Sequence, residues 1–147
     1  MPIRTEAIGK RYDGITYAVG REKIREYASA VGEAGALHHD LAAAHAAGYP
    51  DLVAPPMFAV VYCRPALAMA LFDPELAIDF AMLVHGSQEF HWSALVIAGD
   101  EITTVVSVKE IAERAGLAFY ILESTSANQR GEEVCRGLWT NIVRGVS

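Results

Sequence analysis

The spacing of hydrophobic residues changes along this chain and divides it into a helical first half and a strand-rich second half. Residues 14–19 are short and β-rich, which predicts a first strand. A stripe typical of an amphipathic helix follows over residues 21–31, formed by Ile24, Tyr27, Ala28 and Val31. Gly32 is a suitable stop for this helix.

The next segment predicts a loop and two further helices. Residues 32–39 form the loop, and Asp40 is placed to cap a short Ala-rich helix that ends near Gly48. Pro55 and Pro56 open the next helix, where a proline in the first turn loses no intrahelical hydrogen bond. Residues 57–62 are apolar on every side, which predicts burial on every side. We expect Pro65 to kink or restart this helix and residues 73–74 to end it.

The second half of the chain has the pattern of β-strands. Residues 82–92 alternate between an apolar face (Met82, Val84, Phe90, Trp92) and a polar face (His85, Ser87, Glu89, His91). Strands over 102–111, 116–126 and 132–144 follow, with turns at 98–100 and 128–131, and they predict an antiparallel meander. No repeat, low-complexity tract or linker interrupts the chain, so we expect a single domain over residues 1–147.

These elements predict an α+β fold in which a curved antiparallel sheet wraps around a buried central helix. An apolar helix cannot face water, and the concave sheet is the one partner large enough to cover it. Such a sheet has an exposed edge, which a second copy or a related chain would cover.

Composition excludes several classes of protein. Apolar residues make up 52% of the chain and charged residues 20%, which argues against disorder. The net charge of −6 and the lack of a basic run argue against a nucleic-acid partner. The amino terminus has no apolar signal segment, and Arg64 and prolines interrupt the longest apolar stretch, so we expect no membrane association. Cys63 and Cys135 lie far apart without CxxC spacing, which fits a cytoplasmic protein.

Four stretches in order resemble a known family: 19–27 (VGREKIREY), 30–33 (AVGE), 46–58 (AAGYPDLVAPPMF) and 84–90 (VHGSQEF), the last followed by AGD at 98–100. The chain resembles the MaoC-like (R)-specific hydratases and FAS1-like 3-hydroxyacyl-thioester dehydratases, in particular small dehydratase subunits of actinobacteria. The resemblance covers nearly the whole chain. It implies a hot-dog fold, an acyl-CoA or acyl-ACP substrate, no cofactor, and a homodimer or a heterodimer with a related hot-dog subunit.

The family's catalytic loop has the pattern Asp-x4-His, which falls here on Glu33 and His38, followed by His39 and Asp40. The resemblance therefore implies catalytic roles for Glu33, His38 and Asp40. Hydration or dehydration needs one group to move a proton at Cα and another to handle water at Cβ, and a carboxylate and a histidine that flank one water can do both. The thioester oxygen needs hydrogen-bond donors, which the family takes from a glycine amide at the start of the buried helix. Substrate-binding candidates at that helix start are Pro56, Met57 and Phe58.

The chain departs from the family pattern at four places. Glu33 replaces the family's Asp, and Gly35-Ala36 replaces the usual Asn-Pro. Pro56 stands where the family has the glycine whose amide binds the thioester oxygen, and proline has no N–H. Arg64 stands where active members place a small hydroxyl.

Two functions therefore stay open: a dehydratase or hydratase, alone or as a subunit, and a non-catalytic acyl-binding partner that stabilises a catalytic hot-dog chain. A thioesterase on the same fold needs a carboxylate on the buried helix, and residues 57–70 contain none. A metal site at His38, His39 and His45 lacks a completing ligand at familiar spacing, so none is expected. His85 and His91 are interpreted as part of a solvated sheet face.

Overall fold

The structure is a computed structural model that describes residues 3–146. Its first half contains strand β1 (Arg11–Ala18) and three helices, α1 (Arg21–Ala30), α2 (Leu41–Ala46) and α3 (Ala59–Leu71). Its second half contains four strands, β2 (Leu83–Trp92), β3 (Glu101–Arg114), β4 (Leu117–Ala127) and β5 (Glu133–Arg144). Short 3-10 turns lie at Thr5–Ala7, Ala36–His38, Pro56–Phe58 and Phe80–Met82. The predicted helices and strands are all present.

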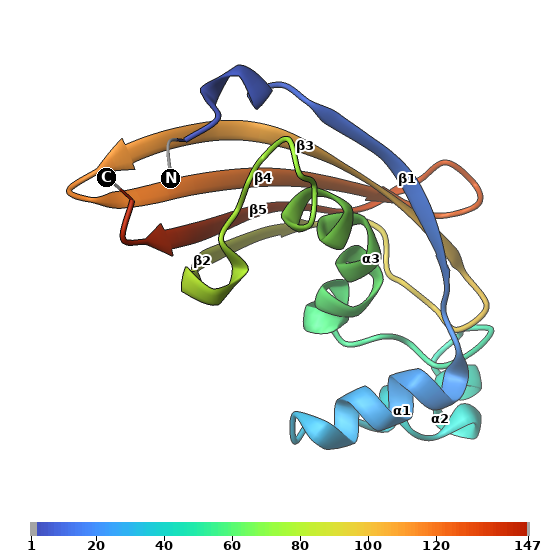
Figure 1. Ribbon diagram of the computed structural model, residues 1–147. Helices are drawn as coiled ribbons and strands as arrows, with labels where there is room; N and C mark the ends of the chain where they lie inside the picture. The colour runs from blue at the N-terminus through green and yellow to red at the C-terminus, as the bar shows by residue number, and fades with distance from the viewer. Residues whose placement is uncertain (1–2, 147) are drawn as a thin grey trace.

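The five strands form one antiparallel sheet in the order β1-β3-β4-β5-β2. The sheet curves over α3, while α1 and α2 form a lobe below one end of it (Figure 1). This arrangement confirms the predicted α+β fold with a central helix and the meander of β3, β4 and β5. β1 and β2 are the edge strands.

Small side chains allow α3 to lie close under the sheet. Ala59, Cys63, Ala66 and Ala70 are fully buried, and their spacing of three and four residues places them on one face of the helix. Without long side chains on this face, the helix backbone packs close to the strands and excludes water. α3 continues without interruption through Pro65 rather than restarting there. No helix within residues 3–146 is long and apolar enough to cross a membrane.

The prediction that residues 57–62 are buried on every side is wrong for part of the segment. Phe58, Ala59 and Tyr62 are buried, but the Met57 side chain is 44% exposed and Val60 and Val61 are only partly covered. The reason is geometric: the sheet of this chain covers one side of the helix and leaves the other open.

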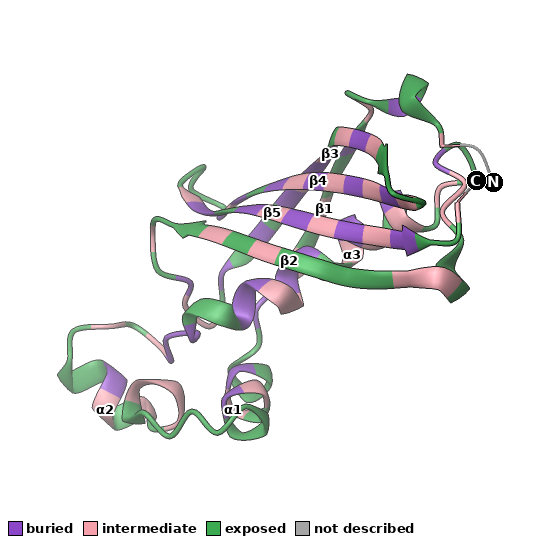
Figure 2. Cartoon of the chain, turned by 90° about the vertical axis from the view of Figure 1, so that its left-hand side faces the viewer, coloured by how far each residue is buried: buried purple, intermediate pink, exposed green. Residues whose placement is uncertain are grey.

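The predicted faces of β2 are also wrong at their amino-terminal end, because a bulge lies between His85 and Ser87. The bulge adds one residue, Gly86, and shifts the alternation of side chains. His85 therefore pairs with Asn141 and faces α3, while Val84 lies on the outer face. As Figure 2 shows, β2 is largely exposed along its length.

We predict that Gly86→Ala destabilises the fold by about 1–3 kcal/mol, the usual cost of overpacking. A β-carbon at Gly86 would lie 2.6 Å from Cδ1 of Ile142 and 3.2 Å from the carbonyl oxygen of Thr140. Urea unfolding measures the change. Gly20→Ala is the control, since a β-carbon there meets nothing within 4 Å, and its effect should stay below about 0.5 kcal/mol. Equal stability of the two variants would contradict the steric role of the bulge.

Candidate active site

The loop after α1 carries the predicted catalytic residues and begins with a sharp turn. Gly32 has φ +75, a left-handed conformation that favours glycine. The Glu33 amide then donates to the carbonyl of Ala28 at 2.8 Å, which ends the helix. The chain thus leaves α1 and crosses toward the segment that precedes α3.

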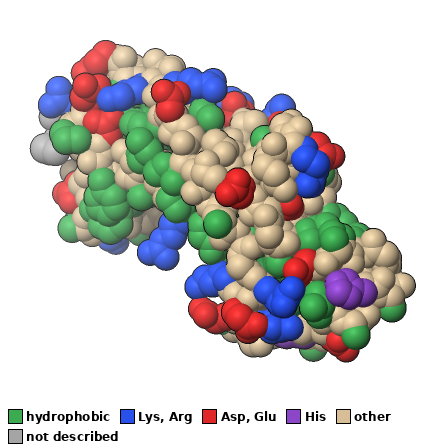
Figure 3. Space-filling view, turned by 90° about the vertical axis from the view of Figure 1, so that its right-hand side faces the viewer, with side chains coloured by type: hydrophobic (Ala, Val, Ile, Leu, Met, Phe, Trp, Pro, Cys, Tyr) green, Lys and Arg blue, Asp and Glu red, His purple; other side chains and the backbone are tan. Residues whose placement is uncertain are grey.

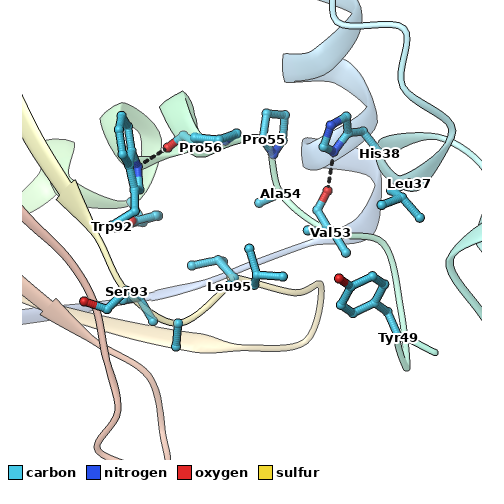
Figure 4. A pocket seen from close by; sticks show the side chains of 14 residues that line it. Leu37, His38, Tyr49, Val53, Ala54, Pro55, Pro56, Trp92, Ser93 and Leu95 are labelled. Atoms are coloured by element: carbon cyan, nitrogen blue, oxygen red, sulfur yellow. Dashed lines mark hydrogen bonds between the residues drawn. The ribbon is translucent and has the colours of Figure 1, made fainter. Parts of the chain in front are cut away.

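His38 is held with one ring nitrogen available for chemistry. Its Nδ1 lies 2.6 Å from the carbonyl oxygen of Val53. A carbonyl oxygen can only accept, so Nδ1 carries the hydrogen and Nε2 is the unprotonated nitrogen of the neutral ring. Val53 lies just before α3, so this hydrogen bond fixes the imidazole beside the start of that helix (Figure 4).

Glu33 and His38 flank the same small space beside Gly35. Oε1 of Glu33 accepts a hydrogen bond from the Gly35 amide at 3.1 Å, so the loop backbone orients the carboxylate. A β-carbon on Gly35 would lie 3.3 Å from Oε1 of Glu33 and 3.5 Å from Nε2 of His38. The absence of a side chain at position 35 therefore keeps the space between the carboxylate and the imidazole open.

The neighbouring polar residues hold the loop in shape. The carbonyl of Glu33 accepts from Nε2 of His39 at 2.7 Å, and Nε of Arg25 donates to the His39 carbonyl at 2.9 Å. Asp40 caps α2, accepting from the amides of Ala42 and Ala43 at 2.9 and 3.3 Å. The catalytic role assigned to Asp40 stays a prediction. Within residues 3–146, no three His, Cys, Asp or Glu side chains are grouped to hold a metal ion.

A cavity of about 260 Å³ lies beside His38, and its wall is mainly apolar. Two hydrogen bonds from side chains join residues of this wall, His38 to Val53 and Nε1 of Trp92 to the carbonyl of Pro56, the latter at 2.8 Å (Figure 4). The lining residues come mainly from the loop, the segment that leads into α3 and the segment after β2, with single residues from α3, β2 and β5: Leu37, His38, Tyr49, Val53, Ala54, Pro55, Pro56, Tyr62, Trp92, Ser93, Ala94, Leu95, Val96 and Val134. Such a cavity suits a ligand that has an elongated apolar part and a polar reacting centre at its end.

The three predicted substrate-binding residues lie in different environments. Pro56 lines the cavity. Phe58 is fully buried in the core, where its ring meets Tyr17 and Tyr27 edge-on with centroids 6.4 and 5.5 Å away. Met57 has an exposed side chain outside the cavity wall. The substrate-binding roles of Met57 and Phe58 stay predictions, and the arrangement of the wall supports only that of Pro56.

Arg64 lies apart from the catalytic loop. It lines a second cavity of about 330 Å³ with His85, Trp139 and Asn141, and neither Glu33 nor His38 belongs to that wall. His85 also lines this cavity, on the side of the sheet that faces α3, and its side chain is exposed as expected for a solvated position.

Sequence reasoning missed the segment after β2, which forms one side of the first cavity. An isolated antiparallel bridge between Val53 and Ile97 brings this segment to the helix start. The Ala54 amide donates to the Val96 carbonyl at 2.8 Å, which reinforces the pairing. Within this segment, the sequence could have indicated only Trp92, because it is a large apolar residue at the end of a predicted strand.

An ion pair joins α1 to the segment before α3 and so fixes the lobe over the cavity. Nε and Nη2 of Arg21 donate to the two carboxylate oxygens of Asp51 at 2.9 and 2.8 Å. This hydrogen bonding, against the opposing effect of partial burial, lowers the pKa of Asp51 to about 2. The amide of Leu52 adds a further hydrogen bond to the same carboxylate.

The fold and the site define a hot-dog protein of the dehydratase and hydratase class. A profile of the FAS1-like dehydratase domain region matches residues 6–136, and the chain belongs to this family. A UPF0336 protein of Saccharopolyspora erythraea is 43% identical over 148 residues, which cover 100% of this chain and 95% of that relative. A UPF0336 protein of Thermobifida fusca is 38% identical over 146 residues, with 99% and 96% covered.

Solved structures of this class superpose over most of the chain. The C-terminally truncated HadBC (3R-hydroxyacyl-ACP dehydratase) complex of Mycobacterium tuberculosis has a chain that matches with a TM-score of 0.83 and 26% identity, with 95% of this chain and 99% of that chain covered. The (R)-hydratase of A. caviae matches with a TM-score of 0.70 and 19% identity, with 93% and 96% covered. The second match, at this identity, supports the fold alone.

We predict that Asp51→Asn lowers stability by about 0.5–1 kcal/mol near neutral pH, as expected for a partly exposed ion pair. Because the pKa of Asp51 is lowered in the folded state, the stabilisation by its carboxylate is present above about pH 4 and is lost as the pH falls through about 2. The difference between wild type and variant should therefore shrink below about pH 4. Urea unfolding between pH 7 and pH 2.5 measures this difference in stability.

Glu26→Gln is the control, because it removes an exposed ion pair between Glu26 and Lys23, both of which lie on α1. A difference that stays constant with pH would contradict the role of this ion pair.

Proposed function

We propose that this chain hydrates 2-enoyl thioesters and dehydrates (R)-3-hydroxyacyl thioesters, carried by CoA or an acyl carrier protein, as one subunit of a hot-dog dimer. One observation carries the proposal: the Glu33 carboxylate and Nε2 of His38 face the same gap beside Gly35, and His38 also lines an apolar cavity. Membership of the dehydratase family supports the reaction class.

The gap suits a water molecule that both side chains contact. In hydration, the pair withdraws one proton from this water as its oxygen bonds to Cβ, and a proton is returned to Cα. Dehydration runs the same steps in reverse: Cα loses its proton, the Cβ–O bond breaks and water leaves. His38 can serve as the base because its hydrogen bond to Val53 leaves Nε2 unprotonated in the neutral ring.

The helix start is the natural place for the thioester oxygen. Partial positive charge gathers at a helix amino terminus and stabilises the negative charge that grows on that oxygen. Pro56 has no N–H, so the first amide of the helix that can donate is that of Met57. The Met57 amide makes no hydrogen bond with any residue in the described range 3–146. We assign the Met57 amide as the donor to the thioester oxygen.

A partner chain is the second part of the proposal. β2 is an edge strand whose outer side has no partner within residues 3–146, and exposed edges of this kind pair with other chains. Two structural neighbours, HadBC and ChsH1-ChsH2 of Mycobacterium tuberculosis, are complexes. We propose that this chain likewise associates through β2.

We predict that His38→Ala and Glu33→Gln each lower kcat/KM for crotonyl-CoA hydration by at least about 100-fold, the usual contribution of a general acid or base. The loss of absorbance of the enoyl thioester measures the rate, and circular dichroism checks that the variants fold. His91→Ala is the control, since this exposed histidine lies on the outer sheet face beside Glu89. Wild-type rates in both site variants would rule out this site.

Gly35→Ala tests the gap itself. The backbone at position 35 has φ −58 and ψ 133, which alanine adopts without strain. Its methyl group would lie 3.2 Å from Cδ2 of His38 and 3.3 Å from Oε1 of Glu33. We expect kcat/KM to fall by about 100-fold, since displacements of about 1 Å have that effect, with the melting temperature nearly unchanged. An unaltered rate would show that the space between the two side chains is not used.

Pro56 favours a second candidate, a non-catalytic acyl-binding subunit, because the family's glycine amide is absent at this position. Pro56→Gly separates the two candidates by restoring that N–H. If the missing donor limits a catalytic chain, kcat should rise by about 10- to 100-fold. Wild type without turnover, together with an inactive Pro56→Gly variant that still binds acyl-CoA in calorimetry, would favour the non-catalytic subunit.

A further inference from the structure

The first cavity has an open rim and a closed inner end. At the rim, the side chains of Trp92 and Leu95 are 49% and 51% exposed, and Ser93 is exposed as well. At the inner end, Tyr62 from α3 and Val134 from β5 are only 2% and 1% exposed. A ligand can therefore enter past the segment after β2 and is stopped where α3 meets the sheet.

The surface around the rim favours one orientation of a bound thioester. Figure 3 shows charged side chains gathered on the lobe formed by α1 and α2, which carries the loop of His38. The cavity wall is mainly apolar, and charged or polar groups of a carrier are costly to bury without partners. This contrast favours a carrier that stays in water beside the lobe and an acyl chain that runs from His38 toward Tyr62.

Tyr62 has little freedom to move aside for a ligand. Its ring centroid lies 6.2 Å from that of Phe58, which is fully buried. Burial raises the pKa of the Tyr62 hydroxyl, and the neighbouring thiols of Cys135 and Cys63 raise it further. The hydroxyl therefore stays protonated beside two thiols, and the ring is packed between the helix start and the sheet.

A hydrogen-bonded cluster of polar side chains lies next to Tyr62, beneath α3. Sγ of Cys63 lies 3.4 Å from Oγ of Ser126, and Oγ of Ser126 lies 2.7 Å from Oγ1 of Thr104. These three side chains are fully buried. An apolar chain that passed Tyr62 would separate them and leave polar groups without partners in a buried position, which is unfavourable. The cluster therefore blocks an apolar continuation of the cavity beneath α3.

We propose that Tyr62 sets an upper limit on acyl-chain length and makes this protein selective for short-chain acyl thioesters. This inference rests on the proposed function and names the class of substrate for the same site. The cavity of about 260 Å³ is smaller than the roughly 300–1,000 Å³ typical of pockets for drug-sized ligands. An acyl chain longer than the cavity must either displace the Tyr62 ring or leave its terminal methylene groups in water.

A length series of saturated acyl-CoAs tests the limit without turnover. Butyryl-, hexanoyl-, octanoyl- and decanoyl-CoA are titrated into wild type and into Tyr62→Leu by calorimetry. One methylene group in an apolar pocket changes a preference by about 10- to 200-fold. The affinity of wild type should therefore peak at butyryl- or hexanoyl-CoA and fall at least about tenfold by decanoyl-CoA. Tyr62→Leu should raise the ratio of decanoyl to butyryl affinity by at least about tenfold.

Three further variants control the experiment. Tyr120→Leu is the matched control, because Tyr120 is a tyrosine of similar burial that lies on β4 outside the cavity wall, and this variant should keep the wild-type profile. Tyr62→Phe removes the hydroxyl but keeps the ring, and it should also keep that profile. Val134→Ala enlarges the same inner end and covers the case in which Tyr62→Leu fails to fold.

Affinity that rises steadily from butyryl- to decanoyl-CoA in wild type would overturn the inference. So would an unchanged profile in both Tyr62→Leu and Val134→Ala. Because calorimetry needs no turnover, an inactive protein that shows the length limit would contradict the catalytic proposal alone. An active protein without the limit would contradict this inference alone, and a lack of binding by all four acyl-CoAs would overturn both.

Discussion

Burial of α3 beneath the concave sheet is the constraint on which the rest of this structure depends. The face of small residues on α3 permits close contact with β1, β3 and β4, and it fixes where the helix begins relative to the strands. Because the helix start is fixed, the segment around Val53 that leads into it is fixed as well. His38 is then oriented by the Val53 carbonyl, and the apolar cavity forms between this segment and the chain that follows β2.

The same constraint produces two distinct sides of the helix. One side is sealed by the chain's own sheet, and its amino-terminal end supports the Glu33–His38 loop. The other side lines the second cavity, to which Arg64 and His85 belong. A bulge of one residue at Gly86 places His85 on the face of the sheet that lines this cavity. The two cavities thus lie against different sides of one helix.

The departures from the family pattern have different consequences in three dimensions. Gly35 keeps the space between Glu33 and His38 open, so the loss of the usual Asn-Pro is compatible with a water site there. Pro56 removes one amide from the helix start, and its carbonyl is bound by Trp92. Arg64 lines the second cavity, whose wall includes neither Glu33 nor His38. The unusual residues therefore lie at the helix start and in the second cavity, while the space between Glu33 and His38 stays open.

The sequence by itself determined the order of helices and strands, the Asp40 cap and the central helix, because these follow from local periodicity and turn residues. The assignment of Glu33 and His38 came from the resemblance to the family's loop pattern. Tertiary structure alone decided that Val53 would orient His38, that the segment after β2 would form a cavity wall, and that Phe58 would join the core rather than that wall. It also decided that one side of α3 is left uncovered by the sheet and that the His85 side chain faces α3. These features depend on contacts between residues distant in the chain and on a one-residue bulge, and neither leaves a periodic signal along the sequence.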